Sequence, residues 1–269
     1  MKLTVLVDNN TYIDQYYLGE PAVSYYIEDG NEKILFDVGY SDLFIRNAQA
    51  LHIDFNTLSK IVISHGHNDH TGGLKYLGNQ YDLSQVELIA HPDAFREKVF
   101  GEEYIGSNLC EEEISSLGNL LLSKAPISIS EKIVFLGEIP TVHAFETREA
   151  IGQQKVGDAF INDYVLDDSA LVYNSKNGLF IITGCSHSGI CNIIEYAKEV
   201  CHNHNVLGVI GGFHLFDIDM KSNNTIQYLV DNGIKELYPC HCVSFKVKAE
   251  MNHYIPIHEV GVGLTINLK

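Results

Sequence analysis

A dense group of potential metal ligands constrains this 269-residue chain more than any other feature of its sequence. Residues 64–73 read Ser-His-Gly-His-Asn-Asp-His-Thr-Gly-Gly and directly follow an apolar run at 61–63. The apolar run predicts a buried strand, and the residues after it predict a turn that leads into a helix over 71–77. Imidazole nitrogen and carboxylate oxygen are donors that zinc, iron and manganese accept. Four such side chains fall within six residues: His65, His67, Asp69 and His70.

The spacing of these four side chains bears on the number of metal ions. His65 and His67 are two residues apart in an extended turn and can point the same way, whereas Asp69 and His70 lie where the chain enters the helix. One tetrahedral ion is a poor match for four ligands from so short a loop, because a catalytic ion also keeps an open position. The segment therefore favours two ions that share it. The alternative is a polar turn whose histidines only cap the helix.

Three more histidines follow apolar strands in the second half of the chain. Predicted strands at 180–183, 207–210 and 236–238 precede His187, His214 and His241, respectively. Active sites in open α/β sheets lie outside the carboxyl ends of the strands. These histidines and the 64–73 segment are therefore expected to converge.

The remaining pattern alternates short strands and helices. We expect strands at 2–7, 22–27, 33–36, 86–90, 126–129, 132–136, 141–145, 170–173, 179–183 and 261–268, and helices at 41–51, 92–99, 111–122, 190–202 and 223–232. A single domain over 1–269 is expected, with an inserted helical segment at about 100–125 and a long loop at about 146–168. The loop is interpreted as a substrate lid or as an ordinary surface loop.

Composition excludes several classes of protein. A net charge of −17, with only 18 lysines and arginines, argues against nucleic acid as a partner, since that binding depends on basic surface. The six cysteines include no C-x-x-C pair, so neither a disulfide scaffold nor a zinc finger is expected. The N-terminus enters a strand at once, which leaves no room for a signal peptide, and no apolar run approaches the about 20 residues of a membrane span. We expect a cytoplasmic protein without a membrane partner, and the oligomeric state stays open.

Several motifs together resemble one known family. Besides the 64–73 segment they are Leu6-Val7-Asp8-Asn9-Asn10, Phe36-Asp37-Val38-Gly39, Thr183-Gly184-Cys185-Ser186-His187-Ser188-Gly189, Gly211-Gly212-Phe213-His214 and Pro239-Cys240-His241-Cys242. The chain resembles the metallo-β-lactamase-fold superfamily. Within it, the chain is similar to a subgroup of metal-dependent hydrolases related to the dihydropterin ribofuranosyl-aminobenzene phosphate synthases. The resemblance implies an α/β fold, the αββα sandwich, in which two mixed β-sheets are flanked by helices.

The resemblance also implies a ligand set. It assigns His65 and His67 to a first ion, with His187 as the candidate third ligand. It assigns Asp69 and His70 to a second ion, with His241. His214 is a ligand, a substrate contact or a core histidine. Asp69 and His214 are the candidate catalytic residues.

The chain departs from the family pattern at one ligand position. Many relatives place a metal-bridging aspartate after the strand that ends here at Thr183, where this chain has Cys185. A Cys185 thiolate would favour zinc, and an inert packed thiol is the alternative. The bridge could instead come from Asp163, Asp167 or Asp168, or from solvent.

Two further aspartates are expected to support the site. Asp37 resembles a superfamily aspartate that accepts hydrogen bonds from the ligand loop, and Asp8 is expected to face the pocket. A simple turn is the alternative for each.

One or two divalent ions are therefore expected, with zinc favoured and manganese, iron or magnesium open. The leading hypothesis is a hydrolase that uses a metal-activated water on a small ester, lactone or phosphate-containing molecule. Helix starts after Thr71 and Ser188 could hold a phosphate group. The alternatives are a synthase that forms a C–N bond between a dihydropterin and an arylamine, a di-iron oxygen reductase, and a metal-binding protein without turnover.

Overall fold

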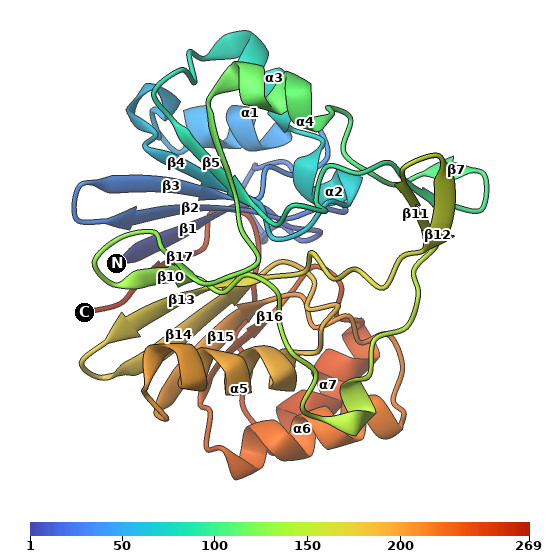
Figure 1. The fold of residues 1–269 in the computed structure, drawn as a ribbon. Coiled ribbons are helices and arrows are strands. Elements are labelled where there is room, and N and C mark those ends of the chain that lie inside the picture. The colour runs from blue at the N-terminus through green and yellow to red at the C-terminus, as the bar shows by residue number, and fades with distance from the viewer. The chain divides into compact units, whose positions relative to one another are not determined.

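The computed structural model describes residues 1–269 and contains two compact units (Figure 1). Unit 1 comprises Met1–Lys124, Ala150–Asp167 and Gly261–Lys269, and unit 2 comprises Ala125–Glu149 and Asp168–Val260. Each unit has its own sheet, helices and apolar core. None of the helices is both long enough and apolar enough to cross a lipid bilayer.

A seven-stranded mixed sheet forms the centre of unit 1, in the order β17-β1-β2-β3-β4-β5-β8. Its strands are β1 (Lys2–Val7), β2 (Ser24–Asp29), β3 (Glu32–Phe36), β4 (Lys60–Val62), β5 (Glu87–Ala90), β8 (Asn119–Leu122) and β17 (Thr265–Asn267). The tight turn between β2 and β3 uses Gly30 at a φ of 61°, a conformation that glycine adopts without steric cost. From β3 to β8 the neighbouring strands are parallel.

Helices cover one face of this sheet (Figure 1). They are α1 (Leu43–Ala50), α3 (Leu74–Gln80) and α4 (Glu111–Leu117), and the short helices η1 (Phe55–Thr57) and α2 (Asn68–Thr71) belong to the same unit. Phe44 of α1, Leu77 of α3 and Ile114 of α4 are all buried in one apolar cluster with Ile61 of β4. Burial of this apolar surface is the main favourable term that holds the helices on the sheet.

A second sheet of unit 1 has four short strands in the order β12-β11-β6-β7. They are β6 (Lys98–Phe100), β7 (Glu103–Tyr104), β11 (Gln153–Val156) and β12 (Ala159–Asn162). The middle of the 146–168 segment, expected to be a long loop, is therefore a β-hairpin whose first strand pairs with β6.

Unit 2 has a six-stranded sheet in the order β16-β15-β14-β13-β10-β9. Its strands are β9 (Ile127–Ser128), β10 (Ile133–Phe135), β13 (Ala170–Ser175), β14 (Gly178–Thr183), β15 (Val206–Gly211) and β16 (Glu236–Pro239). Its helices are α5 (Ile190–Cys201), α6 (Met220–Asp231), α7 (Phe245–Tyr254) and η2 (Ala144–Glu146). Glu146 accepts hydrogen bonds from the backbone N–H groups of Cys191 and Asn192, which satisfies the first turn of α5.

The predicted fold class is confirmed: mixed sheets are flanked by helices, and the helices expected at 190–202 and 223–232 correspond to α5 and α6. Three local predictions were wrong: the 92–99 segment is a turn followed by β6, α4 ends at Leu117 rather than 122, and residues 141–145 form no strand. The helix α7 was not predicted. Lys98 explains the first of these errors, because its buried ion pairs draw it into β6. The single domain over 1–269 stays a prediction.

Candidate metal centre

The ligand loop of unit 1 begins where β4 ends, and glycine allows its close approach to neighbouring backbone. A Cβ atom at Gly66 would lie 1.9 Å from the carbonyl oxygen of Ala94. At Gly73 a Cβ would lie 2.1 Å from the carbonyl oxygen of Val38. Neither position can carry a side chain without a backbone shift, so the two glycines set the path of the loop and the start of α3.

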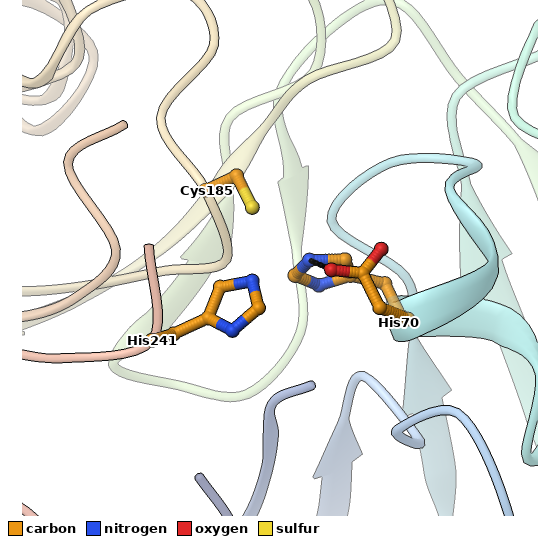
Figure 2. A group of neighbouring side chains, drawn as sticks. His70, Cys185 and His241 are labelled. Carbon is orange, nitrogen blue, oxygen red and sulfur yellow. Dashed lines mark ion pairs between the residues drawn. The ribbon is translucent and has the colours of Figure 1, made fainter. Parts of the chain in front are cut away.

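Three imidazoles of unit 1 lie against one another. His65 Nε2 is 3.1 Å from His67 Nδ1, and the ring centroids of His65 and His70 are 4.2 Å apart. All three rings are buried, and His70 projects from α2 (Figure 2). A carboxylate oxygen of Asp69 lies 3.5 Å from His70 Nε2, and the Asp69 side chain is 26% exposed. The loop therefore presents nitrogen and oxygen donors together, with only the carboxylate open to solvent.

Asp37 supports this loop from the end of β3. Its Oδ1 accepts a hydrogen bond from the backbone N–H of Ser64 at 2.7 Å, and its Oδ2 accepts one from the Ser64 hydroxyl at 2.7 Å. His70 Nδ1 lies 2.7 Å from the same Oδ2. Asp37 adopts a left-handed φ of 55°, which aspartate tolerates better than most residues. The carboxylate thereby orients His70 and leaves Nε2 as its other nitrogen.

Their surroundings shift the pKa values of His67 and His70 in opposite directions. Burial lowers the pKa of His67 to about 4, against the opposing charge of Asp69, so this ring is neutral at pH 7. Burial also acts to lower the pKa of His70, but Asp69 and Asp37 hold it well above its ordinary value. Two carboxylates beside one buried ring favour a positive charge at this position, which a proton or a metal ion can supply.

Unit 2 collects its own donors at one edge of its sheet. The strands β14, β15 and β16 are parallel neighbours, with Ile182, Ile210 and Tyr238 in register. His187, His214 and His241 follow these three strands, and the ring centroids of His187 and His214 are 4.4 Å apart. Because these strands are parallel neighbours, their carboxyl ends lie at the same edge of the sheet of unit 2, as expected.

Cys185 lies among these donors. Its sulfur is within 4.8 Å of a ring nitrogen of His187 and of one of His241. Figure 2 shows the Cys185 and His241 side chains pointing toward one another. His214 and His241 adopt left-handed φ values of 49° and 50°. Residues held in this sparsely populated region cluster at functional sites.

The aspartates considered as substitutes for the bridging ligand have other partners. Asp168 accepts hydrogen bonds at Oδ2 from the backbone N–H and the hydroxyl of Ser188, whereas its buried Oδ1 makes no hydrogen bond. Asp163 and Asp167 form ion pairs with Lys98. Asp8 is buried at the end of β1 and accepts a hydrogen bond from the backbone N–H of Asn10 at 2.9 Å, as in a turn. Sequence reasoning missed Lys98, because it lies 65 and 69 residues from its two partners.

The donor chemistry of each unit fits a divalent transition metal. Unit 1 offers three buried imidazoles and one carboxylate, and unit 2 offers imidazoles and a thiol. Imidazole, carboxylate and thiolate are the ligands that zinc takes in proteins, and the first two also suit iron and manganese.

Comparison with known proteins found a matching family model, two relatives and a similar solved structure. Residues 18–197 match the family model described as Metallo-beta-lactamase superfamily. An uncharacterized protein of Methanocaldococcus jannaschii is 33% identical over 95% of this chain and 97% of its own length. The 7,8-dihydropterin-6-methyl-4-(beta-D-ribofuranosyl)-aminobenzene-5'-phosphate synthase of the same organism is 30% identical over 92% of this chain and 89% of its own. The crystal structure of Tm1679, a metal-dependent hydrolase of the beta-lactamase superfamily, superimposes with a TM-score of 0.86 at 27% identity, covering 100% of this chain and 99% of that one.

Proposed function

Because the chain belongs to the metallo-β-lactamase superfamily, we propose that it is a metal-dependent hydrolase of a small ester, lactone or phosphate-containing molecule. The observation that carries the proposal is the buried group of His65, His67 and His70 beside the partly exposed carboxylate of Asp69. The chain has this donor set, and a structural relative is a metal-dependent hydrolase. Both observations support hydrolysis over a purely structural metal site.

The proposed ligand set follows the family resemblance. His65, His67 and His187 would hold a first ion, and Asp69, His70 and His241 a second, with Cys185 as a further donor. The family pattern and the donor chemistry of each unit support this assignment. Zinc is the proposed ion, because imidazole and thiolate donors both suit it. Such an ion supplies Lewis acidity, which lowers the pKa of water and polarises a carbonyl or phosphoryl oxygen.

The chain's own residues have distinct proposed roles. Asp69 combines a carboxylate with access to solvent, so it can orient a water molecule and accept its proton. Asp37 holds the His70 ring in one orientation through the contact at Nδ1. His214, whose ring lies beside that of His187 and which is partly exposed, is proposed to contact the substrate.

A second function has its own support. The synthase from M. jannaschii shares 30% identity along nearly the whole chain, so C–N bond formation between a dihydropterin and an arylamine is the alternative. Both reactions would use the same ligands. Release of phosphate or pyrophosphate from a dihydropterin substrate, measured with and without an arylamine, separates them: release that depends on the amine favours the synthase.

The proposal is tested first by metal analysis of purified protein. We expect about two equivalents of a divalent metal per chain, and loss of about one of them in His241→Ala. His253→Ala is the matched control, because this histidine of α7 has a 74% exposed side chain. Metal-loaded protein should hydrolyse at least one substrate of an ester, lactone and phosphodiester panel, and treatment with a chelator should abolish the activity. Full metal content without turnover across the panel would contradict hydrolysis.

A further inference from the structure

A fully buried lysine of unit 1 holds two buried carboxylates. Lys98 Nζ in β6 lies 2.7 Å from Asp163 Oδ2 and 3.0 Å from Asp167 Oδ1, and none of the three side chains is more than 1% exposed. Burial acts to lower the pKa of Lys98, but the two carboxylates outweigh it and raise this pKa. A buried ion pair often contributes little net stability compared with an apolar core of the same volume. The backbone groups that the two carboxylates bind therefore indicate what the buried ion pairs do.

The two carboxylates differ in the backbone group that each one binds. Asp163 Oδ1 accepts the N–H of Val165 at 2.8 Å, within its own loop. Asp167 Oδ2 accepts the N–H of Gly66 at 2.7 Å, from a residue 101 positions earlier in the chain. Gly66 is the residue between His65 and His67. Of the two carboxylates, therefore, only Asp167 connects Lys98 to the histidine loop.

The same loop is tied to β6 by a second path. The backbone N–H of Asn68 donates to the carbonyl oxygen of Ile105 at 2.8 Å, and Ile105 N–H donates to the carbonyl oxygen of Lys98 at 2.9 Å. The loop is thus held at Gly66 and at Asn68 by two residues that each contact Lys98. The bond from Gly66 is the charge-assisted one, and such bonds are roughly twice as strong as neutral ones.

We propose that Asp167 is a positioning residue, whose carboxylate, held by Lys98, fixes the peptide between His65 and His67 and so presents both imidazoles to a metal ion. This inference rests on the proposed function, since it concerns the same ligand loop. Partners that orient metal ligands typically change metal affinity by about 10- to 100-fold when they are removed. In this role Asp167 acts through the Gly66 peptide, in addition to its electrostatic interaction with His67.

The chain offers a matched pair of substitutions. Asp167→Asn and Asp163→Asn each remove one negative charge from Lys98 with no change in side-chain size. Each carboxylate accepts one backbone N–H besides the Lys98 ammonium. In each variant the asparagine has a single carbonyl oxygen to accept from both donors. The variants differ in whether the disturbed peptide belongs to the histidine loop, and Asp167 also interacts electrostatically with His67.

Three measurements compare these variants with the wild type. Zinc affinity, measured by competition with a chelator, should weaken by at least about 10-fold in Asp167→Asn and by less than about 3-fold in Asp163→Asn. The absorption spectrum of the cobalt-substituted protein should change only in Asp167→Asn. Thermal unfolding of the metal-free proteins should show similar loss of stability in both. Equal effects of the two variants on zinc affinity and on the cobalt spectrum would overturn the inference.

A fourth measurement separates this inference from the proposed function. In metal-free protein, the imidazole resonances of His65 and His67 should shift in Asp167→Asn and stay in place in Asp163→Asn. If the wild type binds no metal but this selective shift occurs, the proposed function fails and the positioning role stands. If the wild type binds metal but both variants leave the two imidazoles unchanged, the positioning role fails and the proposed function stands.

Discussion

Asp37 and His70 form the closest carboxylate–imidazole pair of the ligand loop. Oδ2 of Asp37 lies 2.7 Å from Nδ1 of His70, and neither side chain is exposed. The two residues are 33 positions apart in the sequence and come from the end of β3 and from α2. Because the same carboxylate also accepts the Ser64 N–H, it fixes both the start of the loop and the ring that ends it.

The first prediction concerns this pair. Asp37→Ala removes the acceptor that orients His70, so we expect metal affinity to fall by about 10- to 100-fold. Asp54→Ala is the control, because Asp54 caps the short helix η1 at an exposed position of the same unit. Chelator competition measures both. Metal affinity in Asp37→Ala within about 2-fold of the wild type would show that Asp37 is only a turn residue.

The second prediction concerns the buried charge of Lys98. Lys98→Met leaves Asp163 and Asp167 as buried carboxylates without their cation, and breaking a buried pair in this way costs about 3–5 kcal/mol of unfolding free energy. Urea unfolding measures the change. Lys155→Met, in the neighbouring strand β11, removes an exposed pair with Glu97 and should leave the urea midpoint almost unchanged. Similar midpoints for the two variants would contradict a structural role for the buried charges.

The third prediction is a pH dependence of stability. Burial acts to raise the pKa of Asp167, but Lys98 and His67 outweigh it and hold this pKa at about 2, against an ordinary value of 3.8. The unfolded chain therefore binds a proton at a higher pH than the folded chain does. This contribution, about 2 kcal/mol, is present above pH 4 and is lost as the pH falls toward 2.

Unfolding of metal-free protein at pH 2 to 5 tests this sign. The difference in unfolding free energy between the wild type and Asp167→Asn should shrink below about pH 4, because the asparagine does not titrate. A difference that stays constant across this range would mean that Asp167 has an ordinary pKa in the folded chain.

The fourth prediction concerns glycine in the ligand loop. Gly66→Ala places a methyl group where the Ala94 carbonyl oxygen lies, so the peptide between His65 and His67 must move and metal affinity should fall by at least about 10-fold. Gly101→Ala is the control. Its Cβ would meet open space, and its left-handed φ of 62° costs about 1 kcal/mol of backbone strain. Gly101→Ala should therefore lower the unfolding midpoint slightly and leave metal affinity unchanged.

Local sequence was sufficient for much of the fold and for the choice of candidate donors. The His-x-His-x-Asp-His spacing after an apolar strand pointed to the metallo-β-lactamase superfamily, and the family match confirms that resemblance. The helices α5 and α6 and the strands that precede His187, His214 and His241 also agree with their predicted positions within a few residues. Periodic apolar patterns and turn residues are local signals, so a single sequence contains them.

Only the tertiary structure decided what supports those donors. The Asp167 carboxylate reaches Gly66 across 101 residues, and Lys98, which the pattern around Pro92 assigned to a helix, lies in β6 between two buried aspartates. Residues 153–162 form a hairpin of β11 and β12, and β11 also pairs with β6, a strand from far earlier in the chain. Residue types and hydrophobic periodicity can be read from neighbouring residues. Ion pairing and strand pairing depend instead on which distant segments of the chain meet. The sequence therefore determined which side chains are available as metal ligands. The folded chain determined which distant residues contact the loop that carries them.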